Sequence, residues 1–341
     1  MTRSAVSARA PGGGTAAGST LLSVPRSRNL YLTSFYQARR LLRLSVRCAS
    51  KEDPMKPAAF EYVRPGSLNE ALQALSRHAG NAKILAGGQS LVPMMNLRML
   101  HPAVIIDINR VPGLDAIRTD GDALVVGALA RHSTLRDSPI VAKHCPLMRE
   151  AYRYVAHKPI RNRGTLGGNI SHADPASEMP AVLVATDATI VVKSAKGERK
   201  IAAANFFIGL MQTALQTGEM VTEIRIPIAP ANQGWAFEEA ANRKGDFAMA
   251  AIGATLTLTG GVCSQAAVAV AGMSDRATRL SALEALLERK PLDDDLIMRA
   301  AVLAKSSVKP DSSYHADVDF KRDLAEALTE RALKNARARC K

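Results

Sequence analysis

The sequence predicts an α+β fold built from several packed units. Short apolar segments bounded by Gly, Pro or Asp-Gly turns recur along most of the chain after residue 60, which is typical of strands. Segments with helical spacing of apolar residues stand near the start and near the end of the same region. The chain has 341 residues, with 47% hydrophobic and 22% charged, so it can bury a sizeable core and hold two or three domains.

A small α/β unit is predicted first. A capping box at residues 67–70 begins a helix that Gly80 ends. Apolar strands are expected at 84–86 and 104–108, and a hairpin at 114–119 and 123–127 turns at Asp120-Gly121. One face of the helix carries the apolar side chains Leu68, Ala71, Leu72 and Leu75.

A mainly β unit follows, and a separate C-terminal α+β domain begins after Pro230. In the second unit we expect a helix over 146–154, a hairpin over 189–194 and 198–202, and a strand over 221–226. In the C-terminal domain the pattern predicts antiparallel strands and then helices marked by Leu280 to Leu287 and Leu324 to Ala332. The strands are expected at 235–240, 250–259 and 265–271.

Residues 83–100, KILAGGQSLVPMMNLRML, combine a strand, a glycine turn and a second apolar segment rich in Met and Leu. Paired glycines such as Gly87-Gly88 let backbone N–H groups converge and let a ligand approach closely, which is how loops hold phosphates. Most glycine pairs are ordinary turns, so this loop alone is weak evidence for a ligand.

A second glycine loop strengthens the ligand hypothesis. Residues 161–180 read RNRGTLGGNISHADPASEMP, in which Thr165, Gly167, Gly168 and Asn169 pair glycines with side chains that hydrogen-bond phosphates or sugars. The two loops are about eighty residues apart in the chain and could face one ligand.

The first loop, AGGQSLVPMMNLR, resembles the flavin-binding signature of the FAD subunit of molybdenum hydroxylases, the family of carbon monoxide, nicotine and xanthine dehydrogenases. The second loop resembles the other FAD loop of that family, in the same order and at the same spacing. Two further stretches, RKGDFAMAAIGATL and YHADVDFKRDLAEALTERAL, are similar to its C-terminal domain. The resemblance covers residues 55 to about 335.

The resemblance implies a two-lobed FAD-binding domain of the vanillyl-alcohol oxidase (PCMH) type over 55–229, with lobes of about 55–109 and 110–229. A smaller α+β domain would then occupy 230–341. It implies an oxidoreductase subunit that transfers electrons through FAD from iron–sulfur clusters to an external acceptor. Its partners would be a large molybdenum-cofactor subunit and a small 2Fe-2S subunit, in a heterotrimer that could dimerise. The sequence indicates neither the substrate nor the acceptor.

The resemblance also implies a set of cofactor contacts, with no acid–base catalyst and no metal ligand in this chain. In the family an Asp usually stands where this chain has Glu178, and some members have a Lys at the position of Glu238. The implied FAD contacts are Ile84, Leu85, Ala86, Gly87, Gly88, Gln89, Ser90, Leu91, Thr165, Leu166, Gly167, Gly168, Asn169, Glu178 and Val221.

Other candidate sites are weaker. His157 and His172 lack metal-ligand spacing, so hydrogen bonding is the better interpretation. Ser90 has no His–Asp partner in the sequence that would make it a nucleophile. Asp174 and Glu178 lie four residues apart, and anchoring of the loop is favoured over a general acid–base pair.

Two other classes of function fit the sequence less well than a flavoprotein subunit. A stand-alone flavin oxidase of the vanillyl-alcohol oxidase type would need a larger substrate domain than the C-terminal segment provides. A nucleic-acid-binding protein is suggested by the net charge of +14, but residues 1–51 hold nine basic residues and no acidic one. The rest of the chain has no dense basic block and no aromatic ladder for base stacking.

The cysteines and the N-terminal residues 1–54 bear on where in the cell the protein is located. Cys48, Cys145, Cys263 and Cys340 have no C-x-x-C spacing, which favours reduced thiols in a cytoplasmic protein over a metal site. No run of eighteen apolar residues predicts a membrane span. Residues 1–54 imitate a mitochondrial transit peptide in composition. The favoured interpretation is that Met55 is the initiator and that residues 1–54 are untranslated or disordered.

Overall fold

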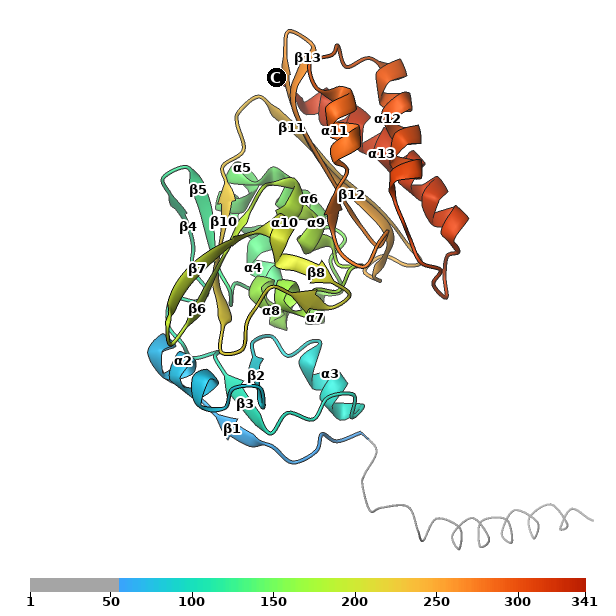
Figure 1. Ribbon diagram of the computed structural model, residues 1–341. Coiled ribbons are helices and arrows are strands. Elements are labelled where there is room, and N and C mark those ends of the chain that lie inside the picture. The colour runs from blue at the N-terminus through green and yellow to red at the C-terminus, as the bar shows by residue number, and fades with distance from the viewer. Residues whose placement is uncertain (1–54) are drawn as a thin grey trace, which may run out of the picture. The chain divides into compact units, whose positions relative to one another are not determined.

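A computed structural model describes residues 55–341, which fold around three larger sheets, each with its own helices (Figure 1). The expectation for residues 1–54 lies outside the described residues. Residues 54–341 form one compact unit, so the domain boundaries near 109 and 229 stay predictions. Within residues 55–341 no helix has the length and apolar character needed to cross a membrane.

The first sheet carries the first glycine loop at one edge. Its three parallel strands have the order β1-β3-β2, and α2 (Leu68–Arg77) connects β1 to β2. Half of the predicted capping box is present: Ser67 Oγ accepts from the Glu70 N–H as the N-cap of α2. Glu70 Oε2 accepts from the Gly66 N–H instead of that of Ser67. The strands are β1 (Glu61–Val63), β2 (Ala82–Leu85) and β3 (Val104–Asp107), and the short helix α3 (Leu91–Asn96) follows the loop.

The second sheet is antiparallel, with the order β4-β5-β10-β6-β7. Both predicted hairpins are confirmed, and the first turns at Gly121, whose φ is +60°. The strands are β4 (Ile117–Asp120), β5 (Ala123–Gly127), β6 (Thr189–Ser194), β7 (Gly197–Ala202) and β10 (Met220–Pro227). A small hairpin of β8 (Phe207–Gly209) and β9 (Gln212–Thr213) follows the short helix α10 (Ala203–Phe206).

Helices fill the connection between β5 and β6, including most of the stretch predicted as the second glycine loop. Thr165 is the N-cap of α8 (Leu166–His172), and Ser177 precedes α9 (Glu178–Ala185). Every residue of α9 is buried, so this helix has no polar face to give an amphipathic pattern. The other helices of the connection are α4 (His132–Asp137), α5 (Pro139–His144), α6 (Pro146–Ala151) and α7 (Lys158–Arg163).

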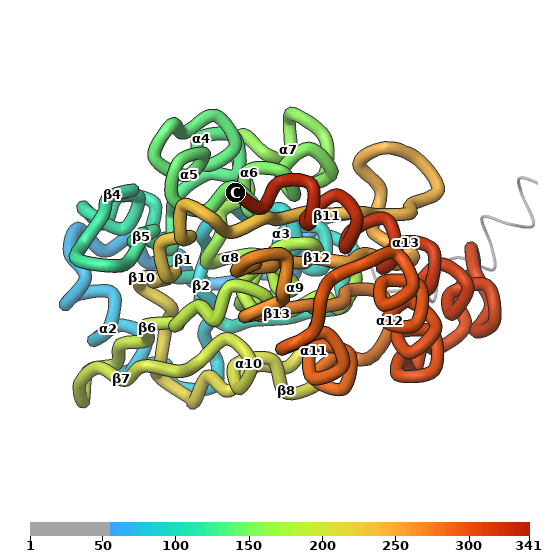
Figure 2. Tube along the Cα trace, turned by 90° about the horizontal axis from the view of Figure 1, so that it is seen from above, coloured from blue at the N-terminus to red at the C-terminus, as the bar shows by residue number. Residues whose placement is uncertain are grey.

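The third sheet lies between two groups of helices. Its strands have the order β11-β12-β13-β14, and the predicted antiparallel pairing of the three long strands is confirmed. Ala236 and Ala240 share a core with the C-terminal helices, whereas Trp235 and Phe237 pack into the core that contains α6 and α9. Figures 1 and 2 both place α12 and α13 together on the outer side of this sheet. The elements are β11 (Gln233–Ala241), β12 (Ala248–Thr259), β13 (Val262–Ala271), β14 (Thr278–Arg279), α11 (Ser281–Leu287), α12 (Asp294–Ser307) and α13 (Val318–Arg339).

Candidate functional site

The two glycine loops lie against each other in the structure. A β carbon added at Gly87 would stand 2.8 Å from the Cα atom of Gly164 and closer still to the carbonyl oxygen of Arg163. A β carbon at Gly168 would come within 3.7 Å of that of Ala86. Segments some eighty residues apart therefore meet at backbone contact, as required if both are to face one ligand.

Two side chains that the sequence did not single out join these loops. Asn109 Nδ2 donates to the carbonyl oxygen of Ala86 (2.8 Å) and to Asp107 Oδ1 (2.6 Å). Asn109 Oδ1 accepts from Arg131 Nη2 (2.6 Å), and Arg131 Nη1 donates to the carbonyl oxygen of Arg163. One feature of the sequence could have identified Asn109. It follows β3, a parallel neighbour of β2, so both strands end at the same sheet edge.

The first loop offers unpaired backbone donors. Gly88 has a φ of +73°, a left-handed conformation that favours glycine. Gln89 Nε2 donates to the Gly87 carbonyl (3.1 Å) and holds the turn. Within residues 55–341 no acceptor is bonded to the N–H groups of Gly87, Gly88, Gln89 or Ser90. Successive N–H groups of a turn that lack a protein acceptor can form an anion-binding concavity.

The N–H groups of the second loop are already bonded within the protein. Leu166 donates to Ala130 O (3.0 Å), Gly167 to Ala128 O (2.9 Å), and Gly168 to Thr165 Oγ1 (3.1 Å). The Asn169 N–H donates to Thr165 O (2.9 Å). The backbone of the second loop can thus shape a ligand site without donating hydrogen bonds to the ligand. The polar group that it still offers to a ligand is the Asn169 side chain.

The Asn169 amide has one end without a partner. Its Nδ2 lies 2.8 Å from Ser177 Oγ, while its Oδ1 is buried and unbonded among the residues described. A serine hydroxyl both donates and accepts, so either end of the amide can face the hydroxyl. The other end is then available to a phosphate, a sugar hydroxyl or another polar group of a ligand, which is what a buried amide needs.

The glycines of the second loop have different roles. A β carbon at Gly167 would stand 2.6 Å from the Ala128 carbonyl oxygen, so this glycine is required by backbone packing. At Gly168, apart from the backbone of its own helix, Thr165 Oγ1 is the only atom of residues 55–341 that would come closer than 3.4 Å, at 2.9 Å. Gly168 therefore borders space that no protein backbone fills, and a ligand can approach there.

Glu178 and Val221 lie behind the second loop. Glu178 begins α9 and is 4% exposed, and its burial, with a smaller contribution from Asp174, raises its pKa to about 7. Asp174 Oδ1 accepts from the Ala176 N–H (2.9 Å), which fits the loop-anchoring role. Val221 is buried in β10, next to Thr222, whose carbonyl oxygen accepts from the Ala128 N–H.

The remaining predicted contacts belong to the first loop and its flanks. Ile84 and Leu85 are in β2, Ala86 follows it, and Leu91 begins α3. All four are partly exposed. The sequence order thus becomes a spatial one for the two loops themselves, because Ala86 and Gly87 lie against Arg163, Gly164 and Gly168.

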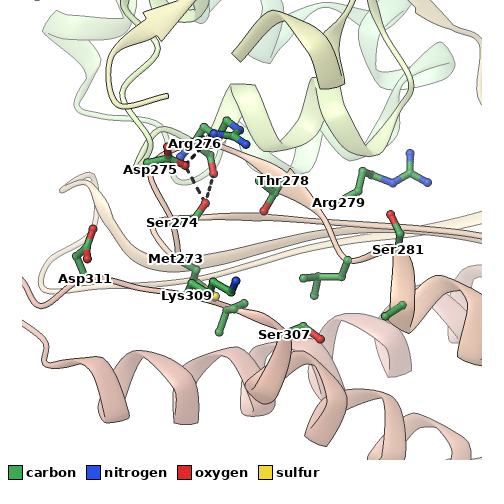
Figure 3. A pocket seen from close by; sticks show the side chains of 13 residues that line it. Met273, Ser274, Asp275, Arg276, Thr278, Arg279, Ser281, Ser307, Lys309 and Asp311 are labelled. Atoms are coloured by element: carbon green, nitrogen blue, oxygen red, sulfur yellow. Dashed lines mark hydrogen bonds and ion pairs between the residues drawn. The ribbon is translucent and has the colours of Figure 1, made fainter. Parts of the chain in front are cut away.

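A sizeable pocket lies away from the junction of the two glycine loops (Figure 3). It measures about 540 Å³ and is formed by the β13–β14 connection, the start of α11 and the end of α12. Its Asp275 and Arg276 pair with each other at 3.1 Å. None of the predicted cofactor contacts lines it, so its size does not mark the candidate site.

Neither candidate histidine lies in a metal site. His157 is exposed beside a pocket of about 360 Å³ that also contains Lys158, Arg161 and Lys244. His172 ends α8 and is half-buried. Within residues 55–341 no three His, Cys, Asp or Glu side chains gather as metal ligands would.

Two family models match the chain. The model described as the FAD binding domain in molybdopterin dehydrogenase matches residues 58–229. The model described as the CO dehydrogenase flavoprotein C-terminal domain matches residues 235–336.

Individual proteins agree with these models. The caffeine dehydrogenase subunit beta of Pseudomonas sp. (strain CBB1) is 42% identical over 285 residues, which cover 83% of this chain and 96% of that protein. The carbon monoxide dehydrogenase medium chain of Hydrogenophaga pseudoflava is 37% identical over 286 residues, 84% of this chain and 100% of its own. A solved carbon monoxide dehydrogenase from the same organism, lacking the Mo-pyranopterin moiety, superposes with a TM-score of 0.82 at 39% identity, over 84% of this chain and 100% of the matched one. The predicted fold class is thereby confirmed.

Proposed function

We propose that this chain is the electron-transfer subunit of a molybdenum hydroxylase, because it belongs to the family of FAD-binding subunits of these enzymes. As a member of that family it is an FAD-binding oxidoreductase subunit. It receives electrons from iron–sulfur clusters of a partner and passes them to an external acceptor. The observation that carries this proposal is the junction of the two loops, where four N–H groups and one end of the Asn169 amide have no partner among residues 55–341.

The groups at the junction suit the phosphate-bearing part of FAD. The pyrophosphate is an anion, and the N–H groups of residues 87–90 can hold it without a cationic side chain in direct contact. The Asn169 amide offers a further hydrogen bond, and Gly168 leaves room for the approach. When bound, FAD supplies hydride and one-electron chemistry through its isoalloxazine ring. The protein's part is to bind and orient that ring.

The proposed contacts with FAD are those that the sequence indicated, and the two loops contribute different kinds of contact. The first loop binds by its backbone, and the second binds chiefly through Asn169 and by its shape. Glu178 and the backbone near Val221 complete the site. Asn109 and Arg131 position both loops and do not themselves need to touch the cofactor.

The partners follow from the family. Relatives bear names such as medium chain and subunit beta, so they work in multi-subunit enzymes. A large subunit with the molybdenum cofactor would hydroxylate the substrate, and a small 2Fe-2S subunit would relay the electrons to this chain, all in the cytoplasm. A heterotrimer, with the option of dimerisation, is the assembly that this division of labour requires.

The test begins with the purified chain and FAD. Binding should be tight and noncovalent, so that acid precipitation leaves the yellow colour in the supernatant. Dithionite should reduce the bound flavin, whereas an organic substrate should reduce it only after the large and small subunits are added. Turnover of an organic substrate by the lone chain, free of molybdenum and iron, would instead establish the stand-alone flavin oxidase.

A further inference from the structure

β11 carries two neighbouring glutamates that the strand sends to opposite faces of the third sheet. Glu238 lies on the side of α13, where its Oε1 accepts from Asn335 Nδ2 (2.7 Å) and its Oε2 is 3.6 Å from Arg331 Nη1. Alternation places Glu239 on the other face, with Phe237. There its Oε2 is buried and has no hydrogen-bond partner among residues 55–341.

The face that carries Glu239 meets the segment following the second glycine loop. The Ala248 N–H donates to Ala176 O (3.3 Å), and the Gly272 N–H donates to Pro175 O (2.8 Å). The next residue, Ser177, is bonded to Asn169 (2.8 Å). The third sheet is therefore fastened directly to the segment that links Asn169 to Glu178.

Resting on the proposed function, we propose that Glu239 is a further contact of FAD, which the third sheet contributes from the side opposite the glycine loops. Its carboxyl group is neutral and donates a hydrogen bond to an oxygen acceptor of the cofactor. A buried carboxyl oxygen without a partner requires one, and FAD offers phosphate, hydroxyl and carbonyl oxygens. Asn169, which has one bonded end, and Glu239 are then two polar groups whose hydrogen bonds one ligand completes.

The surroundings of Glu239 keep its proton in place. Burial raises its pKa to about 8, and the neighbouring Glu178 adds to this effect. The elements packed against this face carry Arg149 and Glu150 in α6, Tyr152, Arg153 and Tyr154 after it, and Asp174 and Glu178 around the start of α9. Of these, Glu178 is the group whose charge acts on Glu239, and a second carboxylate disfavours the carboxylate form of Glu239.

The experiment measures FAD binding by the full chain through the change in flavin fluorescence, between pH 6 and pH 9.5. The unmodified chain should bind about tenfold more weakly at the upper end, because Glu239 then loses its donor and becomes an anion beside a phosphate-bearing ligand. Glu239→Gln keeps a donor at every pH, so its affinity should stay within about threefold across the range above pH 7.5. Glu239→Ala should bind about tenfold more weakly even at pH 6.

Glu238→Gln is the matched control, because it changes the neighbouring carboxylate on the opposite face. It should keep both the affinity and the pH profile of the unmodified chain. Thermal unfolding of each variant verifies the fold, and Glu239→Gln carries the test if Glu239→Ala does not fold.

Three results would overturn the inference. Glu239→Ala could bind as well as the unmodified chain, Glu239→Gln could keep the full loss of affinity near pH 8, or Glu238→Gln could weaken binding as much as Glu239→Ala. In each case the unmodified chain still binds FAD, so the proposed function survives. A folded, unmodified chain that binds no FAD would overturn both.

Discussion

Replacing Gly87 with alanine tests whether the packing of the two loops creates the cofactor site. Gly87 does not have a positive φ, so the methyl group causes no backbone strain of its own. The cost comes from the other loop, because the new β carbon would stand 2.8 Å from Gly164 Cα and closer to the Arg163 carbonyl. Both neighbours are backbone atoms and cannot rotate away.

The size of the effect follows from these contacts. Ordinary contact begins near 3.4 Å, so the loops must separate by about 0.6 Å or more, and such overpacking costs about 1–3 kcal/mol. The Arg163 carbonyl also accepts from Arg131, so the shift disturbs the link between the loops. Hydrogen bonds weaken steeply with geometry, and we expect FAD affinity to fall at least about tenfold.

The assay measures FAD binding by fluorescence and the free energy of unfolding in urea on the same preparations. Gly121→Ala is the control, because Gly121 has a φ of +60° and nothing within 4 Å of an added β carbon. It should lose about 1 kcal/mol of stability from backbone strain and keep its FAD affinity. Gly87→Ala with unchanged FAD affinity would refute the view that close docking of the loops forms the site.

Three other changes separate stability from binding. Arg131→Met removes the guanidinium that joins both loops and should lower the free energy of unfolding by about 1–3 kcal/mol, and equal urea midpoints would count against that link. Gly168→Ala meets only Thr165 Oγ1 closely, so it should reduce FAD affinity with little loss of stability, and unchanged binding would place the ligand elsewhere. Burial raises the pKa of Glu178 to about 7 and of Glu239 to about 8, from an ordinary 4.5. The folded apo chain holds these protons more tightly than the unfolded chain, so its stability should fall as pH rises from about 5 to about 8, and a constant free energy of unfolding over that range would contradict this.

The sequence located the elements that have strong local signals. The capping box at Ser67 and the turn at Gly121 depend on neighbouring residues, so their helix and hairpin could be recognised from short stretches. The long strands of the third sheet were recognisable from their apolar and β-branched residues between glycine turns.

The missed elements owe their structure to distant contacts. α9 is buried on every side, which removes the alternation of polar and apolar residues that marks a helix. The unpredicted helices α4, α5 and α7 span only six residues each, and helices this short depend on tertiary packing more than on propensity. The stretch predicted as the second loop therefore turned out to be largely helical. The helix predicted over 146–154 is present as α6.

By itself the sequence determined the family and the cofactor, because both glycine loops and two C-terminal stretches resemble those of one family in the same order. Only the tertiary structure decided which polar groups are free. The N–H groups of the second loop are bonded to residues 128, 130 and 165, while those of residues 87–90 have no acceptor in the part of the chain that the structure describes. The third sheet likewise directs Glu238 to α13 and Glu239 to the other face. Hydrogen-bond partners and strand faces are set by packing between distant segments, and linear order does not contain that information.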